Sequence, residues 1–338
     1  MRHAILSALG ALAAGANAQD PAPPDGIVID DPAAVWSLTI ENDGYFGNDD
    51  NYTSGFRLAY LSGNRDLDPL GRFVARRVLR IDAPLGQMRI RRGIALAQEI
   101  YTPDTVRAAE PLPDEHPYGA YLYGRITRLI EQPNRVDQLS VDVGVVGPSA
   151  RGEEAQDFVH SIVGRVKSRG WDNQIGDMPG LNVHYDQQRR LASTGYRGGL
   201  GFDVVANAGV SAGTVEVSAR LGANIRFGQN LTAGYGPPRV RPATAGSGFF
   251  REQGRPAWYL FLGTQVEAVG HNVFLDGSPF AGHDPSVDSN VIVADLQAGA
   301  AIQLGRSQLA FSYVRRSEEF RTQDGSQQFG ALSLSRRF

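Results

Sequence analysis

The absences in this sequence narrow the possibilities before any motif is considered. None of the 338 residues is cysteine, which excludes disulfide bonds, thiolate metal sites and cysteine nucleophiles. No run of 18 or more apolar residues occurs, so a membrane-spanning helix is excluded. The formal net charge of −3 gives no reason to expect a nucleic-acid partner. Methionine occurs three times and glycine 40 times, which suits strands joined by turns. The remaining membrane structure is a closed β-barrel.

The N-terminal residues have the composition of a secretory signal. Arg2 and His3 give a positive start, 4–14 form a short apolar stretch, and Ala16-Asn17-Ala18 has the small-x-small pattern of a cleavage site. We therefore predict a signal peptide over 1–18 and an extended lead-in over 19–34. The alternative is an N-terminal hydrophobic helix of a soluble protein.

Alternation of polar and apolar residues dominates the rest of the chain. In the first such segment Trp36, Leu38 and Ile40 alternate with serine, threonine and glutamate. A soluble sandwich would also alternate, but here the polar partners are charged or small, as a barrel lumen requires. We predict an all-β fold over 35–338, an antiparallel up-and-down transmembrane barrel of about twelve strands: 35–43, 52–62, 88–101, 118–130, 136–146, 180–190, 200–211, 214–227, 256–269, 289–303, 307–319 and 328–338. The final Phe338 is typical of an outer-membrane assembly signal.

Three connections interrupt this rhythm. Residues 68–79 have helical spacing and are predicted to form a short periplasmic helix that plugs or flanks the barrel base. Residues 149–166 are predicted to form an extracellular helix, with Gln156, Val159, His160 and Val163 on one face. The pattern of 228–256, which is rich in glycine and proline, assigns no role to that connection.

Polar residues gather at the extracellular ends of the first two strands. Glu41-Asn42-Asp43 ends the first strand and Asn51-Tyr52-Thr53 begins the second, so a short hairpin brings Asp43 and Thr53 to one rim. Grouped carboxylate and amide oxygens can hold Ca²⁺. They can equally form a solvated turn. Strict alternation would send Asn42 and Asp43 to opposite faces, so either the strand ends there or only one of them lines a site.

His160 is the strongest candidate for a general base. A helix against the rim could present its imidazole to the Asn42/Asp43 group, and a neutral histidine can take a proton from water. A structural histidine is the plain alternative, and His116 and His184 are rivals. The sequence contains no G-x-S-x-G motif for a serine nucleophile and no His-x-x-x-His pair for zinc.

Several short motifs occur in the order and spacing of a known family. They are Glu41-Asn42-Asp43, Asn51-Tyr52-Thr53-Ser54-Gly55, Tyr101-Thr102-Pro103, Pro117-Tyr118-Gly119, Gly144-Val145-Val146-Gly147-Pro148 with Gln156 and His160 after it, Gly170-Trp171-Asp172-Asn173-Gln174, and Pro179-Gly180-Leu181-Asn182. On these motifs the chain resembles the lipid A 3′-O-deacylase (LpxR-type) family of outer-membrane enzymes.

The resemblance implies a Ca²⁺-dependent ester hydrolase in the Gram-negative outer membrane, acting on the 3′-linked acyl or acyloxyacyl group of lipid A in lipopolysaccharide. The site would face the extracellular leaflet. His160 matches the family's catalytic histidine, and Gln156 matches its helix glutamine. Asn42 and Asp43 match the pair tied to Ca²⁺ and the oxyanion, with Asp43 as metal ligand, and Thr53 matches the active-site hydroxyl.

The chain departs from the family pattern at three positions. A loop lysine is replaced by Arg107, one position away, and an Asp-Arg-Pro-Tyr motif reads Glu115-His116-Pro117-Tyr118. A helix glutamate is replaced by Val166. We expect Arg107 and Tyr118 to contact substrate. The alternative functions are a phospholipid esterase on the same barrel and a non-catalytic structural or pore barrel, and a monomer is expected.

Small residues at Gly209, Ala212, Ala298 and Ala300 favour a filled lumen over a pore.

Overall fold

The computed structural model describes residues 28, 30–44, 51–110, 112–164, 167–194, 199–236, 248–252, 256–280, 282 and 284–338. The predicted signal peptide, 1–18, and most of the predicted lead-in, 19–34, lie outside these ranges. So do Asp49, Asp50 and Val166.

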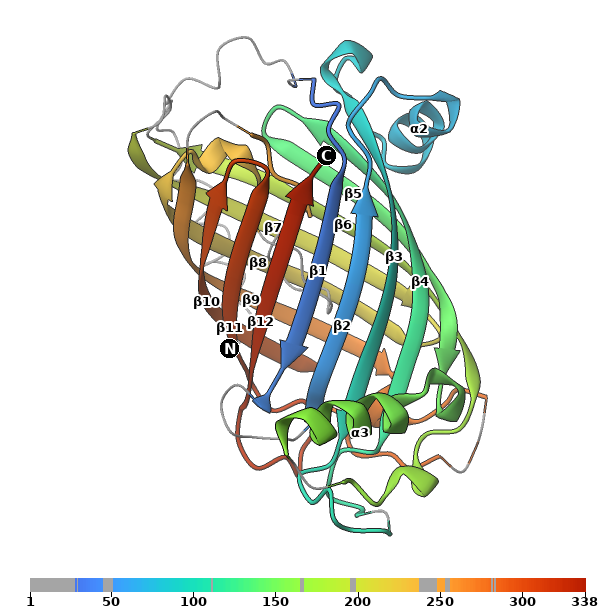
Figure 1. The fold of residues 1–338 in the computed structure, drawn as a ribbon. Coiled ribbons are helices and arrows are strands. Elements are labelled where there is room, and N and C mark those ends of the chain that lie inside the picture. The colour runs from blue at the N-terminus through green and yellow to red at the C-terminus, as the bar shows by residue number, and fades with distance from the viewer. Residues whose placement is uncertain are drawn as a thin grey trace, which may run out of the picture.

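Twelve antiparallel strands form a closed barrel, which confirms the predicted fold class (Figure 1). Each strand pairs with its sequence neighbours, and β1 pairs with β12 to close the sheet. The strands are β1 (Val35–Asn42), β2 (Asn51–Leu61), β3 (Arg89–Thr102), β4 (Gly119–Gln132), β5 (Arg135–Val146), β6 (Met178–Ser193), β7 (Leu200–Gly213), β8 (Glu216–Gln229), β9 (Ala257–Asn272), β10 (Ile292–Leu304), β11 (Ser307–Arg316) and β12 (Gln327–Arg337).

Alternation along each strand separates a polar lumen from an apolar outer wall. In β1, Ser37 and Thr39 are buried and their hydroxyls bond to serines of β12, whereas Trp36 and Ile40 are more than 40% exposed on the outer wall. The prediction for small residues was partly wrong. Gly209 faces the lumen beside Arg220, but Ala212, Ala298 and Ala300 have the parity of the outer wall. Among the described helices, none is long and apolar enough to cross a membrane.

The two ends of the barrel are distinguished by what lies beside them. We call the end where β1 begins and β12 stops the terminal end, and the opposite end the helix end, because α3 (Gly152–Val163) lies there. Figure 1 shows α3 across β2, β3 and β4, and α2 (Pro69–Phe73) at the other end of the barrel.

Charged and aromatic side chains fill the lumen from end to end. Buried arginines each bind a carboxylate on a neighbouring strand: Arg125 with Asp142, Arg226 with Asp203, and Arg316 with Asp295. At the helix end, α4 (Val273–Asp276) turns into the barrel, where Phe274 stacks on Tyr101 with ring centroids 4.1 Å apart.

The connection after β8, whose role the sequence did not indicate, fills the terminal end. Its described residues Tyr235, Phe249 and Phe250 form one buried cluster with Leu61 and Leu129 of the wall. Arg337 of β12 donates to the Phe250 carbonyl at 2.6 Å. Because apolar clusters occupy both ends, the lumen is a packed interior, which argues against a wide pore.

Two segments cover the outer wall of the same strands. At the terminal end, α2 continues into a π-helix, η2 (Val74–Val78), and both pack on outward residues of β3 and β4. This agrees with the predicted helix at 68–79 and places it beside the barrel wall. At the helix end, a 3₁₀ turn, η4 (Pro148–Ala150), leads into α3, which confirms the helix predicted within 149–166.

Candidate active site on the outer wall

The first hairpin brings three predicted site residues together. The strand β1 ends at Asn42, which pairs with Ser54 on the outer-wall face. The side-chain amide of Asn42 donates to the Thr53 carbonyl at 3.0 Å, and the backbone N–H of Asp43 donates to the same oxygen at 3.3 Å. Asp43 is fully buried. Because β1 ends before Asp43, the alternation of the strand does not determine the direction of the Asp43 side chain. Asn42 and Asp43 therefore need not face opposite sides of the wall.

A β-bulge at Thr53 lets adjacent side chains face different surroundings. The register between β2 and β3 shifts between Tyr52 and Ser54, so Thr53 is the extra residue. The Tyr52 hydroxyl donates to Glu41 in the lumen at 2.9 Å. The Thr53 hydroxyl instead meets the hydroxyl of Thr102 at 2.6 Å, and Thr102 has outer-wall parity in β3. The bulge therefore turns a hydroxyl toward the outer wall without exposing the tyrosine.

The segment carrying α3 is fixed tightly on this wall. The Gln98 amide, which points outward from β3, donates to the Ala150 carbonyl at 2.7 Å. Gly152 is required at the first turn, because a Cβ there would lie 2.5 Å from the Ala120 side chain and 2.7 Å from the Trp171 ring. Ala150, Trp171, Tyr118, Ala120 and Ile100 form one buried cluster. This packing sets how close α3 lies to β3 and β4.

The buried face of α3 carries two polar side chains. Gln156 and His160, one turn apart, are only 3% and 4% exposed. The Trp171 indole N–H donates to Gln156 Oε1 at 2.9 Å, and this bond fixes the orientation of the amide. The buried Nε2 of Gln156 has no hydrogen-bond partner among the described residues. A buried donor without a partner is costly, so this amide is well suited to bind a ligand.

The predicted helix face was wrong at one position. Val159 is 42% exposed and its neighbour Phe158 is 67% exposed, so both lie on the side of α3 away from the wall. The side chain of Val163 lies outside the described residues. Apolar side chains face away from the barrel here because the surroundings of the outer wall are themselves apolar.

The expected substrate-binding residues lie beside the site in different environments. Tyr118 is 6% exposed, packs on Trp171, and donates its hydroxyl to the Val106 carbonyl at 3.0 Å. Arg107 is exposed on the same loop. His116, which replaces the family's arginine, is buried and stacks on Tyr101 with ring centroids 5.4 Å apart. Tyr118 thus connects the loop of Arg107 to the segment that holds Gln156.

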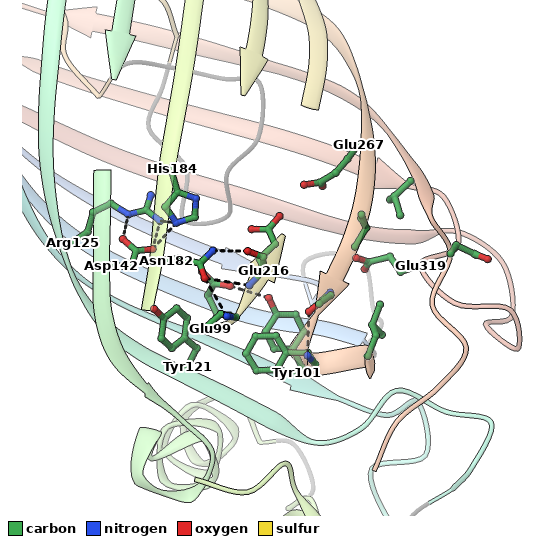
Figure 2. Close-up of a pocket in the computed structure, with 17 residues that line it drawn as sticks. Glu99, Tyr101, Tyr121, Arg125, Asp142, Asn182, His184, Glu216, Glu267 and Glu319 are labelled. Atoms are coloured by element: carbon green, nitrogen blue, oxygen red, sulfur yellow. Dashed lines mark hydrogen bonds and ion pairs between the residues drawn. The ribbon is translucent and has the colours of Figure 1, made fainter. Parts of the chain in front are cut away.

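The rival histidine His184 lies in the lumen, and its partners are on neighbouring strands, so no local sequence pattern indicates them. Its Nδ1 lies 2.7 Å from the Ser211 hydroxyl and its Nε2 lies 2.9 Å from Asp142 Oδ2. The order Ser–His–Asp is that of a hydrolase triad, but Arg125 binds both oxygens of Asp142 and Arg220 donates to the Ser211 hydroxyl. Because of these arginine contacts, the Ser211, His184 and Asp142 side chains belong to the ion-pair network of the lumen. Figure 2 shows His184, Asp142 and Arg125 among the residues that line a luminal cavity. The volume of this cavity is about 50 Å³.

The hairpin supplies oxygen donors suited to a hard cation. Among the described residues, no three His, Asp or Glu side chains are grouped as metal ligands. The Oδ1 of Asn51 is buried and accepts no hydrogen bond from the described residues, and Asp43 and the Thr53 hydroxyl lie within the same hairpin. Carboxylate, amide and hydroxyl oxygens together are the ligand types that Ca²⁺ takes. The residues present therefore fit Ca²⁺ better than a softer metal.

The architecture defines a class of protein. A closed barrel with an even number of antiparallel strands, an apolar outer wall and a charged, packed lumen is an outer-membrane β-barrel. What distinguishes this one is a helix on the outer wall with polar side chains beneath it.

The comparisons with known proteins identify the family. The family model described as outer membrane protein LpxR matches residues 4–338, so the chain belongs to this family of outer-membrane proteins. The solved structure of LpxR from Salmonella typhimurium superposes with a TM-score of 0.71 at 20% sequence identity, covering 90% of this chain and 100% of that one. The β domain of the Bordetella autotransporter BrkA gives a TM-score of 0.40 at 10% identity, covering 90% of this chain and 98% of that one. No curated protein matches the chain.

Proposed function

We propose that this protein is an outer-membrane esterase that hydrolyses the 3′-linked acyl ester of lipid A. The observation that carries the proposal is the location of the buried polar groups. Gln156 and His160 lie under a helix on the outer wall, at the same end of the barrel as Asn42 and Thr53. A site on the lipid-facing side of a barrel takes its substrate from the membrane, whereas a pore would place its functional groups in the lumen.

The orientation of the barrel follows from the same proposal. The terminal end of the barrel faces the periplasm, as in other even-stranded single-chain barrels, and α3 lies at the extracellular leaflet. Lipid A occupies that leaflet, so its ester bonds are within reach of the interface between α3 and the barrel wall. Membership in the family of outer membrane protein LpxR supports this substrate.

In the proposed reaction His160 acts as general base. Its imidazole removes a proton from a water molecule, which attacks the ester carbonyl, and the protonated ring then returns the proton to the leaving alkoxide. The Nε2–H groups of Gln156 are available to donate to the reacting oxygen, because Trp171 holds only the other end of the amide. Water attack needs no covalent enzyme intermediate.

Asp43 is the proposed ligand of Ca²⁺, with Asn51 Oδ1 as a second oxygen donor. When bound, the ion would polarise the ester carbonyl and stabilise the developing oxyanion. Asn42 is less free than Gln156, because its amide already donates to the Thr53 carbonyl. We therefore expect Asn42 to hold the hairpin in shape and Gln156 to contact the substrate.

The test is release of an acyl chain by the purified full-length protein. Lipid A in mixed micelles with Ca²⁺ should become lighter by one 3′-linked acyl group in mass spectrometry, and EGTA should stop the reaction until Ca²⁺ is restored. Phosphatidylethanolamine under the same conditions should remain intact. Hydrolysis of the phospholipid alone would replace the proposal by a phospholipid esterase. Unchanged lipid A and phospholipid would leave a structural barrel.

A further inference from the structure

The second helical segment, α2 with η2, is attached to the outer wall and has no part in the proposed reaction. Val74 and Ala75 are buried against Ile90 of β3 and Ile130 of β4. Ile90 and Ile130 are paired across the two strands and share outer-wall parity. The segment therefore lies outside the barrel, at the terminal end, where a membrane surface would meet the wall.

The strand pairs beside it mark the edge of the apolar band. The outward pair Ile94 and Ile126 is about 60% exposed, as expected of side chains in contact with acyl chains. The next outward pair toward the terminal end is Arg92 with Arg128. This change from isoleucine to arginine is typical of the level of lipid headgroups. The pair after that, Ile90 with Ile130, lies under η2.

The outer side of the segment combines large apolar residues with arginine. Leu70, Phe73 and Val78 are each at least half exposed, with exposed fractions of 52%, 56% and 50%. Exposed arginines lie between and after them, at Arg72, Arg76, Arg77 and Arg80.

Most of this charge is available to a partner. Arg76 donates to the Ile81 carbonyl. The ion pairs of the described residues begin with Arg89 and include none of Arg72, Arg77 and Arg80.

We propose that the surface formed by Leu70, Arg72, Phe73, Arg77, Val78 and Arg80 docks onto an anionic phospholipid leaflet. A short amphipathic helix with exposed apolar residues and arginines binds a membrane interface by burying the apolar side chains and pairing the cations with phosphates. In the proposed orientation this leaflet is the periplasmic one, opposite the leaflet of the esterase site. The docking itself depends only on the barrel lying in a bilayer and not on any catalytic activity.

Spin labelling tests the apolar part of this surface. Because the chain contains no cysteine, Phe73→Cys gives a single labelling site in the full-length barrel. In vesicles of phosphatidylethanolamine and phosphatidylglycerol, a nitroxide at 73 should be accessible to oxygen and protected from a water-soluble nickel reagent. The matched control is Arg306→Cys, an exposed site in the β10–β11 turn at the same end, where the label should remain in water. A label at 73 that is equally exposed to the nickel reagent would overturn the proposal.

Charge replacement tests the preference for anionic lipid. The triple variant Arg72→Gln, Arg77→Gln, Arg80→Gln should retain several-fold less phosphatidylglycerol in native mass spectrometry than the unaltered protein. The matched triple lysine variant should retain nearly as much. All three positions are exposed, so folding should be unaffected, as heat-modifiable gel mobility will verify. Equal retention by the glutamine variant, or equal depth of the label at 73 in pure phosphatidylcholine, would contradict recognition of anionic lipid.

Discussion

The α2–η2 segment and α3 cover the outer wall of the same two strands at opposite ends, and they differ in what they bury. Each places a glycine against the wall, where a Cβ at Gly71 would lie 2.7 Å from Ile90 and a Cβ at Gly152 would lie 2.5 Å from Ala120. Beneath α2–η2 the buried residues are apolar, whereas α3 buries Gln156 and His160.

This contrast separates attachment from chemistry. Burying valine and alanine stabilises a contact, whereas burying an amide donor without a partner costs free energy, and the Nε2 of Gln156 is such a donor among the described residues. A helix that needed only to attach to the wall would bury apolar residues, as α2–η2 does. The polar side chains under α3 are therefore the ones that we propose to act on the substrate. Changes to them should lower activity, whereas changes under α2–η2 should lower stability.

Replacement of His160 by alanine should produce the largest effect. Loss of a general base lowers turnover by about 10² to 10⁴-fold. Mass spectrometry of lipid A after timed incubation measures the loss, and heat-modifiable mobility should be unchanged because the barrel wall is intact. His271→Ala is the matched control, since His271 lies near the end of β9 beside Asp276 of α4 and takes no part in the proposed reaction. Full activity of the His160 variant would remove the base from the proposal.

Trp171→Phe should reduce turnover by about tenfold, because it removes the one hydrogen bond by which Trp171 orients the Gln156 amide. The phenyl ring keeps the packing on Tyr118, but the Gln156 amide loses the N–H that orients it. The reduction should appear in kcat with little change in KM.

A double variant with Gln156→Ala distinguishes orientation from packing. If Trp171 acts through Gln156, adding Trp171→Phe to Gln156→Ala should lower activity no further. Additive losses would mean that Trp171 contributes separately from the amide.

Much of the fold could be predicted because alternation is a local signal. All twelve strands lie within a few residues of their predicted positions, since period-2 patterning is set by which side chains meet lipid. The face of α3 was harder, because the rule that apolar residues face the protein reverses for a helix between wall and membrane. Val159 follows the reversed rule.

The details of the site depend on contacts between distant segments. The bulge at Thr53 depends on the pairing of β2 with β3, and the sequence of β2 alone contains no sign of it. Trp171 belongs to a sequence motif, yet its bond to Gln156 joins residues 15 positions apart that meet only when the loop folds on the wall. The filling of the terminal end by Phe249 and Phe250 likewise requires the closed barrel.

Changes under η2 should alter stability and leave activity intact. Val74→Ala removes two methyl groups from the cluster with Ile90 and Ile130, which should lower the free energy of unfolding by about 1 to 2 kcal/mol. Urea titration in vesicles, followed by tryptophan fluorescence, measures this. Acyl release from lipid A should be unchanged. A loss of activity larger than the loss of folded protein would show that packing under η2 affects the residues under α3.

The smallest predicted effect concerns the N-terminus of α2. Asp68 caps the helix by accepting the Gly71 N–H at 2.6 Å and forms an ion pair with Arg92. Asp68→Ala should lower the free energy of unfolding by about 1 kcal/mol, and Asp68→Asn should recover most of it, because asparagine also caps.

The Gly71 N–H, with help from Arg92, lowers the pKa of the Asp68 carboxyl. Because the pKa is lower in the folded state, the Asp68 carboxylate adds to the free energy of unfolding at any pH above its unfolded-state pKa. This contribution is lost as the pH falls through the folded-state pKa. The difference between the native protein and Asp68→Asn in urea titrations should therefore be present at neutral pH and vanish in acid, and a difference that persists in acid would show that shape and not charge holds α2 in place.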